Sequence, residues 1–337
     1  MDTLNAVEFA RGLIDIDSTT GREAAAGRWL ADRLRALGYS VTEQAVAGER
    51  FNVVATLDPP EVVLSTHYDC VPPFFPSRIG DGRLFGRGSC DAKGILAAQV
   101  AAVERMRAEG HRRVGLLFVV GEERGSDGAV VANTVPPGSK FLVNGEPTDC
   151  RLATGTRGIL RVRLHARGRA GHSSAPEHFE SAIEKLVDAL VRLRGLELPS
   201  NPTFGTTSYS VGLIEGGVAP NVTPARATAE VMFRIVGDAG EVLAAVKTLE
   251  PLVEVEEVLR VSPVRLHTIP GIPAASFPFT TDIPLLERWG VPLLFGPGSF
   301  LLAHTDDEFL ELAEFDASIT TYTEIIAALS EKRGHPT

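Results

Sequence analysis

Residues 84–94 read Leu-Phe-Gly-Arg-Gly-Ser-Cys-Asp-Ala-Lys-Gly and lead into an apolar run, Ile95 to Val103, of helical character. The stretch holds too many glycines for the interior of a strand or a helix, because glycine there costs backbone entropy. Its one acidic residue, Asp91, stands at the start of the expected helix, where aspartate is favoured as an N-cap in any protein. Only partners from other segments would give this carboxylate a further role.

The totals of the chain exclude several classes of protein. With 337 residues it is long enough for two domains and a large core. Its 33 basic and 43 acidic residues give a net charge of −10, which argues against nucleic-acid binding, since that requires clustered positive charge. No apolar run approaches membrane-spanning length, and residues 1–15 do not resemble a signal peptide. The three cysteines therefore indicate free thiols in a reducing cytoplasm.

Helices and apolar strands alternate over the first half of the chain. The expected helices span residues 3–14, 22–37 and 93–109, and the expected strands span 40–45, 52–57, 62–66, 114–120 and 141–144. Polar residues 17–20 are suited to cap the second helix, and Gly38 is suited to end it. This alternation is typical of an α/β fold in which helices flank a mostly parallel central sheet.

From Gly158 onward the chain changes character, and strands with one polar face become common. The expected elements are, in order, a strand at 159–165, a helix at 179–193, strands at 206–214 and 225–235, a helix at 239–249 and a strand at 253–261. This βαββαβ order is typical of a compact two-layer unit. We therefore expect an inserted domain over residues 158–264, within a larger domain made of residues 1–157 and 265–337.

The chain after the insertion is expected to complete the larger domain. Residues 281–289 predict a helix, residues 292–295 a strand and residues 314–332 a final helix. A loop at 296–307 separates that strand from the final helix and carries His304. The last four residues, 334–337, are expected to be disordered.

Histidines and carboxylates stand directly after several of the expected strands. They are His67 and Asp69 after residues 62–66, Glu122 and Glu123 after 114–120, and Glu146 after 141–144. Sites in open α/β sheets lie at the carboxyl ends of the strands, so we expect these side chains at one edge of the sheet. Taken singly, each is more simply interpreted as a surface or loop residue.

Together with Asp91 and His304, these residues supply two imidazoles and several carboxylates. A mixed nitrogen and oxygen set is typical of Zn²⁺, Co²⁺ or Mn²⁺, rather than of a thiolate site or an all-oxygen Mg²⁺ site. The surplus of carboxylates would let one of them bridge two metal ions about 3.5–4 Å apart. Neighbours in an extended segment point in opposite directions, so one of Glu122 and Glu123 can bind a metal while the other faces a water.

A serine or cysteine nucleophile is poorly supported by the sequence. There is no Gly-x-Ser-x-Gly elbow. Cys70 and Cys90 have no evident base partner, and we interpret both as small, partly buried residues. Five further histidines have no partner pattern and are assigned no role: His111, His165, His178, His267 and His335.

Seven segments together resemble the M20 family of metallopeptidases and amidohydrolases, especially the branch of acetylornithine deacetylase, acetyl-lysine deacetylase and succinyl-diaminopimelate desuccinylase. They occur in the family's order and span most of the chain. The segments are Thr-His-Tyr-Asp-Cys-Val-Pro at 66–72, Gly-Arg-Gly-Ser-Cys-Asp-Ala-Lys-Gly at 86–94, Gly-Glu-Glu at 121–123, Gly-Glu-Pro-Thr at 145–148, Gly-His-Ser-Ser-Ala-Pro at 171–176, Asn-Val-Thr-Pro at 221–224 and Ala-His-Thr-Asp-Asp-Glu at 303–308.

The resemblance implies a di-zinc catalytic domain, with Co²⁺ or Mn²⁺ as alternatives to zinc. His67, Asp91 and Glu146 would hold one metal ion. Asp91, Glu123 and His304 would hold the other, so that Asp91 bridges the two. Asp69 would accept a hydrogen bond from His67 and fix its tautomer. Glu122 would act as general base and then as general acid.

The resemblance also implies roles for the inserted domain. It would form the contact of a homodimer, and His172 would reach into the partner subunit's site to stabilise the oxyanion. Asn221 and Arg234 match positions that hold the backbone carboxylate of the substrate. A cis peptide bond is expected after the bridging aspartate, between Asp91 and Ala92.

The implied activity is metal-dependent hydrolysis of the amide bond of a small N-acyl amino acid. The main expectation is deacetylation of N2-acetylornithine or a similar N-acetyl amino acid, in arginine biosynthesis. Alternatives in the same class are a succinyl-diaminopimelate desuccinylase, an aminoacylase, and an M20 dipeptidase or carboxypeptidase. A non-catalytic binding or scaffold protein would have lost a ligand or Glu122, and the sequence retains them all. No nucleic-acid or membrane partner is expected.

Overall fold

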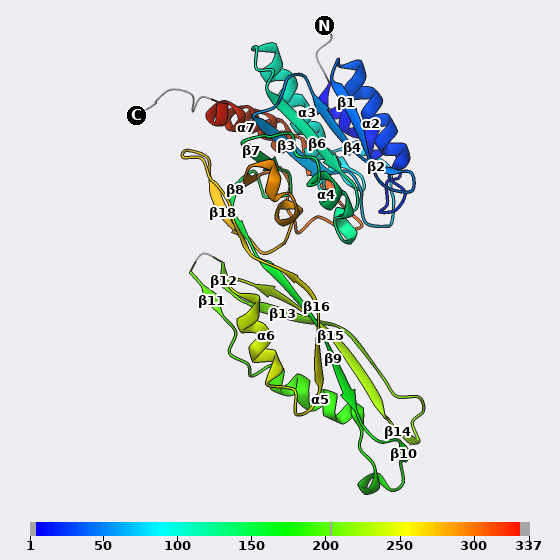
Figure 1. The fold of residues 1–337 in the computed structure, drawn as a ribbon. Helices are drawn as coiled ribbons and strands as arrows, with labels where there is room; N and C mark the ends of the chain where they lie inside the picture. The colour runs from blue at the N-terminus through cyan, green and yellow to red at the C-terminus, as the bar shows by residue number, and fades with distance from the viewer. Residues whose placement is uncertain (1–4, 203, 331–337) are drawn as a thin grey trace. The chain divides into compact units, whose positions relative to one another are not determined.

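The chain folds into two units, which are drawn in Figure 1. The computed structural model describes residues 5–202 and 204–330. Unit 1 runs to Thr154 and takes up the chain again at Leu266–Ala275 and from Thr281 onward, whereas unit 2 comprises Gly155–Arg265 and Ser276–Thr280. In the described part of the chain, no helix combines the length and apolar character that a membrane crossing requires.

Unit 1 is built on a six-stranded sheet with the order β1-β2-β6-β3-β7-β19. Its strands are β1 (Ser40–Ala47), β2 (Arg50–Thr56), β3 (Val62–His67), β6 (Val114–Val119), β7 (Phe141–Asn144) and β19 (Val291–Leu294). The last four of these run parallel to one another, and β1 and β2 are antiparallel to their neighbours. The expected mostly parallel sheet is therefore confirmed. Its parallel strands end at one edge, where ligand sites of such sheets lie.

Helices cover both faces of this sheet, because its central strands are apolar on both sides. One face packs against α1 (Ala6–Ile14), α2 (Ala24–Ala36), α3 (Lys93–Ala108) and α7 (Leu312–Ser330). The other face packs against α4 (Asp127–Ala132) and the 3₁₀ turns η3 (Ile283–Leu285) and η4 (Glu287–Trp289). In β3, Val62 and Leu64 belong to the first core and Val63 to the second, as alternation along a strand requires.

Unit 2 has the βαββαβ order that the sequence predicts. Its elements are β9 (Gly158–Arg167), α5 (Ala182–Leu193), β13 (Ser208–Gly216), β15 (Arg226–Ile235), α6 (Ala239–Lys247) and β16 (Glu254–Val261). The antiparallel sheet has the order β13-β15-β9-β16, and Figure 1 shows both helices on one of its faces. Both begin at a side-chain cap, since Ser181 accepts from the N–H of Glu184 and Asp238 from that of Gly240.

Short strands and turns that the sequence did not predict complete the two units. Unit 1 contains the small sheet of β4 (Arg78–Gly80), β5 (Arg83–Phe85) and β20 (Phe309–Glu311), and the turn η1 (Glu122–Arg124). Unit 2 contains the pairs β10 (Gly171–His172) with β14 (Val222–Thr223) and β11 (Ser200–Asn201) with β12 (Gly205–Thr206), and the turn η2 (Pro176–His178). The strands β8 (Leu152–Thr156), β17 (Val264–Arg265) and β18 (Ala274–Phe277) contain or adjoin the points where the chain passes between the units.

Two local predictions are wrong. Residues 281–289 form two 3₁₀ turns instead of a helix, because Pro284 has no N–H to donate and the buried Trp289 is held by its own bond from Nε1 to the carbonyl of Ala132. Residues 17–20 do not cap α2, whose N-cap is Glu23, since Asp17 bonds to Thr19 instead. The predictions for residues 1–4 and 331–337, including the disorder of 334–337, lie outside the described residues.

Candidate metal centre

His67 is the last residue of β3, at the edge where the parallel strands end, and is 1% exposed. Its Nδ1 lies 3.0 Å from the backbone carbonyl of Asp69, and its Nε2 lies 3.0 Å from Oδ1 of Asp91. A carbonyl oxygen only accepts, so Nδ1 carries a proton and Nε2 is the nitrogen directed at the carboxylates. Burial acts to lower the pKa of His67, but its bonds to Asp69 and Asp91 outweigh this and raise the pKa well above its ordinary value.

Asp91 directs its two carboxylate oxygens at two different histidines. Oδ1 faces His67, and Oδ2 lies 3.4 Å from Nε2 of His304. Burial acts to raise the pKa of Asp91, but the two histidines hold it well below its ordinary value. The interpretation of Asp91 as a helix cap is wrong. The N-cap of α3 is Ala92, with no side-chain cap, because the Asp91 carboxylate is engaged by the histidines. The peptide bond between Asp91 and Ala92 is cis, as the resemblance implies.

Glu123 and His304 meet on the other side of Asp91. Glu123 lies in η1, just after β6, and its Oε1 is 2.9 Å from Nε2 of His304. Hydrogen bonds to Asp91 and Glu123 raise the pKa of His304 to about 10. One ligand atom each from His67, Asp91 and Glu123 lies within 4.8 Å of the others, which is the spacing of side chains around a metal ion.

Glu146 follows β7 and is 6% exposed. Among the described residues, none forms a hydrogen bond with its Oε1. Burial and the charge of Glu122 raise the pKa of Glu146 well above its ordinary value, and it also interacts with His67 and Asp91. A buried carboxylate oxygen without a partner is costly unless a cation or a proton satisfies it. The residues present therefore fit a metal ion at this edge of the sheet.

Asp69 is bonded mainly to groups other than His67. Its Oδ1 is 3.5 Å from Nδ1 of His67, whereas its carboxylate accepts hydrogen bonds from the Thr20 hydroxyl (2.8 Å) and from the N–H groups of Glu122 (3.1 Å) and Glu123 (3.3 Å). Asp69 thus contacts His67 through its backbone carbonyl and positions the turn of Glu122 and Glu123 through its carboxylate.

Glu122 stands in the same turn as Glu123 and is partly buried. Burial raises its pKa well above the ordinary value, although the nearby charge of His67 acts against this. The charges of Asp282, Glu123 and Asp91 act in the same direction as burial. A carboxyl group with a raised pKa is suited to take up a proton and to release it near neutral pH.

The other three predicted site residues belong to unit 2. His172 lies on β10, where its Nδ1 accepts from the N–H of Ser174, and β10 pairs with β14 next to Asn221. Arg234 lies near the far end of β15, partly buried, and burial lowers its pKa. The strand from Arg226 to Arg234 extends about 26 Å. The structure therefore brings His172 and Asn221 together, but not Asn221 and Arg234.

Two buried carboxylates near the site were not assigned a role from the sequence. Asp282 is 1% exposed, and among the described residues none bonds to its Oδ1. Burial raises the pKa of Asp282 to about 6. Glu308 is fully buried and bonds to the backbone of Asp91. Glu308 ends one of the matching segments, which was a usable signal, whereas Asp282 lay in a segment interpreted as an ordinary helix.

Comparison with known proteins identifies the family. The family model described as peptidase family M20/M25/M40 matches residues 63–328. The chain is 35% identical over 382 aligned residues to a probable carboxypeptidase of Aspergillus clavatus, covering 98% of this chain and 84% of the relative. It is similar in fold to a tripeptidase of Staphylococcus aureus, with a TM-score of 0.81, 19% identity and coverage of 97% and 98% of the two chains.

A second solved structure of similar fold is an M20 family metallo-carboxypeptidase of Sulfolobus solfataricus. Its TM-score is 0.77 at 17% identity, with coverage of 98% of this chain and 99% of that chain. The matched range includes every predicted metal ligand and Glu122, and most of the sheet that positions them. The relatives' names do not single out the deacetylase and desuccinylase branch. The predicted family is confirmed: the chain belongs to peptidase family M20/M25/M40 and is a hydrolase of that family.

Proposed function

We propose that this enzyme is a two-metal hydrolase that cleaves the amide bond next to a free C-terminal carboxylate, as a carboxypeptidase or dipeptidase does. The observation that carries the two-metal site is the geometry of Asp91: its Oδ1 faces His67 and its Oδ2 faces His304. The name of the Aspergillus relative supports a carboxypeptidase. It favours this alternative over deacetylation of N2-acetylornithine.

The five predicted ligands divide into two sets that share Asp91. His67 and Glu146 would complete one set, and Glu123 and His304 the other. When bound, the metal ions would lower the pKa of a water and polarise the scissile carbonyl. Zn²⁺ suits these nitrogen and oxygen donors, and so do Co²⁺ and Mn²⁺. Two observations support this division: Oε1 of Glu146 has no hydrogen-bond partner within residues 5–202 and 204–330, and Glu123 is in short contact with His304.

Glu122 would hold and move the proton. It would take one proton from the attacking water and give it to the nitrogen of the scissile amide, so that this nitrogen leaves as a neutral amine and not as an anion. The raised pKa of Glu122 supports this role, because the group can carry the proton between the two steps. Asp69 would keep Glu122 in position through the N–H of that residue.

The enzyme is further proposed to form a homodimer through unit 2. Strand β13 is an edge strand whose residues are exposed or partly exposed, including Leu213 and Ile214. Helix α5 carries an exposed apolar stripe with helical spacing: Ile183, Val187 and Val191. A second copy would pair its own β13 antiparallel to this edge and cover the stripe, as a two-fold interface allows.

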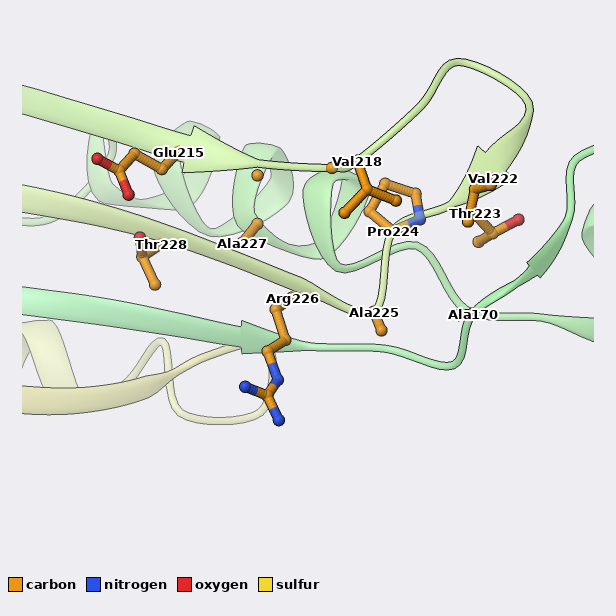
Figure 2. A pocket seen from close by; sticks show the side chains of 12 residues that line it. Ala170, Glu215, Val218, Val222, Thr223, Pro224, Ala225, Arg226, Ala227 and Thr228 are labelled. Carbon is orange, nitrogen blue, oxygen red and sulfur yellow. The ribbon is translucent and has the colours of Figure 1, made fainter.

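The surface at the end of β13 supports this proposal. Ile183, the first residue of the stripe, lies beside the end of β13: a Cβ built on Gly216 would be 3.1 Å from its side chain. A pocket of about 560 Å³ adjoins it, lined by residues 215–218, 222–228 and Ala170, and Figure 2 shows Val218 and Pro224 in that lining. Val218 is 87% exposed. In a dimer, the paired strands β10 and β14, with His172 and the adjacent Asn221, would serve the partner subunit's site, which would account for the distance between Asn221 and Arg234.

A substrate screen tests the proposed reaction. The metal-stripped enzyme would be reloaded with Zn²⁺, Co²⁺ or Mn²⁺ and given N-blocked dipeptides with a free C-terminus, the same dipeptides as C-terminal amides, N2-acetylornithine and N-succinyl-diaminopimelate. We expect metal-dependent hydrolysis of the N-blocked dipeptides that have a free C-terminus. The C-terminal amides should be hydrolysed at least about 100-fold more slowly, because a site built for a carboxylate rejects analogues that lack it. Equal rates on acid and amide, or activity on N2-acetylornithine alone, would contradict the carboxypeptidase proposal.

Cys70, Cys90 and Cys150 are free thiols in the structure. Free thiols support a reducing compartment, so we retain the proposal of a cytoplasmic enzyme.

A further inference from the structure

Glu308 gathers four hydrogen-bond donors on one buried carboxylate. Its Oε1 accepts from the backbone N–H groups of Gly88, Cys90 and Asp91, each at 3.0 Å. Its Oε2 accepts from Nη1 of Arg87 at 2.7 Å. Only 1% of the Glu308 side chain is exposed. Converging backbone N–H groups form a site for an anion, and here the chain supplies that anion itself.

The loop that these bonds hold is the one that carries Asp91. It begins where β5 ends and finishes where α3 starts. The N–H of Gly86 bonds to the backbone carbonyl of Glu308 at 3.2 Å, so Glu308 serves four N–H groups of this loop. Gly88 has a φ of +90°, and a Cβ there would lie 2.8 Å from Sγ of Cys70. The conformation is therefore irregular and tightly packed, and Glu308 satisfies the N–H groups of Gly86, Gly88, Cys90 and Asp91.

Arg87 extends the same arrangement to the loop that follows His67. It is 2% exposed, its Nε donates to the carbonyl of Pro73 at 3.1 Å, and its guanidinium lies 4.9 Å from the ring centre of Phe75. The pair of Glu308 and Arg87 thus links three loops of unit 1. Each of these loops follows or carries one predicted metal ligand: His67, Asp91 or His304.

Stability alone does not account for such a pair. A buried ion pair is often no more stabilising than apolar side chains of the same volume, because both charges lose their hydration. What the pair supplies is a fixed geometry. Three of the donors to Glu308 are backbone N–H groups of the Asp91 loop, and one of these is the N–H of Asp91 itself.

We propose that Glu308 is a positioning residue of the metal centre. The carboxylate of Glu308 fixes the backbone of Asp91. His304 lies four residues before Glu308 in the chain, so Glu308 also fixes the position of the His304 loop relative to the Asp91 loop. This rests on the two-metal site proposed above. Loss of the Glu308 charge should therefore weaken metal binding, beyond any effect on folding.

The test is metal binding by the full-length Glu308→Gln variant. In this variant the amide can offer its oxygen to the three N–H groups only by turning its NH₂ towards Arg87. The metal-stripped proteins would be titrated with Co²⁺, following the visible spectrum and the heat of binding. We expect wild type to bind two ions, and the variant to bind the weaker ion about 10–100-fold less tightly with an altered spectrum, as loss of a group that orients metal ligands typically does.

Glu311→Gln is the matched control. Glu311 lies three residues further on, pairs with Arg83 at 2.7 Å and has a side chain that is 43% exposed. The control should bind both ions as wild type does. A Glu308→Gln variant with wild-type Co²⁺ affinity and spectrum, even with a lower Tm, would overturn the positioning role alone. A wild-type chain that binds no pair of ions would overturn both this inference and the proposed function.

If Glu308→Gln does not fold, the double variant Arg87→Met/Glu308→Gln keeps the test decisive. It removes the buried cation that the single variant leaves unpaired, and it keeps an oxygen for the three N–H groups. A neutral amide is a weaker acceptor than a carboxylate, so the double variant should still bind the weaker ion less tightly than wild type. Wild-type binding by this variant would overturn the inference.

Discussion

At the scale of single residues, the site is a set of carboxylates whose environments differ. Asp91 is held ionised between two histidines, whereas burial raises the pKa of Glu122 and Glu146. Such a separation of pKa values assigns roles, because one carboxylate stays charged and another can carry a proton.

Glu122→Gln should lower kcat by about 10²–10⁴-fold, because the glutamine cannot accept the proton of the attacking water. Metal binding should remain at two ions, since none of the proposed ligand sets includes Glu122. The measurements are steady-state kinetics and metal content after dialysis. Glu109→Gln, at the exposed end of α3, is the control and should keep full activity. A Glu122→Gln variant with wild-type kcat would show that the base lies elsewhere.

Asp282→Asn should stabilise the metal-free chain at neutral pH. The folded-state pKa of about 6 lies above the ordinary value of 3.8. The folded chain therefore binds the extra proton between these values, and wild-type stability falls as pH rises through the window from about 4 to 6. Asparagine carries no such cost, so the gain should approach about 3 kcal/mol at pH 7 and vanish at pH 4 or below.

The check for Asp282 is thermal unfolding of the metal-stripped proteins at several pH values. Asp316→Asn, an exposed position on α7, should leave Tm unchanged throughout. A shift in Tm of equal size at pH 4 and pH 7 would mean that the charge of Asp282 is not the cause.

Among the elements, the parallel strands of unit 1 position the candidate site, and the edge strand β13 of unit 2 would form the proposed dimer contact. β3, β6 and β7 are adjacent in the sheet, so residues just after their ends converge although they are far apart in sequence. In unit 2, helix α5 buries one face, including Leu186 and Ala189, and exposes the stripe with Val187. An apolar stripe next to an unpaired edge strand is suited to association.

Val187→Lys should weaken the dimer at least about 10-fold, because a two-fold interface would bury this charge twice without a partner. Asp188→Lys is the control, since that position lies on the same helix but about 100° away from Val187. Light scattering after size-exclusion chromatography, over a range of concentrations, measures the masses. If Val187→Lys has the same mass as wild type at every concentration, α5 does not form the interface.

At the scale of the whole molecule, the two units have separate cores, and all the predicted metal ligands belong to unit 1. Metal binding should therefore stabilise unit 1 through mass action and leave the core of unit 2 unaffected. The chain has only two tryptophans, Trp29 and Trp289, and both lie in unit 1. Tryptophan fluorescence thus reports on one unit.

Chelation of the metals should lower the unfolding temperature followed by tryptophan fluorescence. At free metal 100-fold above Kd, the bound ion would contribute about 2.7 kcal/mol. Far-UV circular dichroism also reports on the helices and strands of unit 2, so we expect it to show a second transition that chelation does not move. A fluorescence transition unchanged by chelation would contradict a metal site in unit 1.

Much of the fold was predictable because its signals are local. The apolar runs of β3, β6 and β7 and the periodicity of α3 and α7 fix these elements within a few residues, since each buries its own apolar surface. The candidate site residues could be predicted because they directly follow these strands, where sites of open α/β sheets lie. Where a tertiary contact competes with local preference, prediction failed: residues 281–289 became 3₁₀ turns around Trp289, and Asp91 faces histidines instead of capping α3.

The sequence alone predicts the α/β class, the order of elements in unit 2 and the residue types of the proposed nitrogen and oxygen metal site. Three features emerge only from the packed fold: which oxygen of Asp91 faces which histidine, the bonds of Asp69 to the turn of Glu122 and Glu123, and those of Glu308 to the Asp91 loop. The reason is that periodicity reports burial along a single element. Hydrogen bonds between loops that are distant in sequence, such as Glu308 and Asp91 at a separation of 217 residues, depend on how the elements pack, which no local pattern encodes.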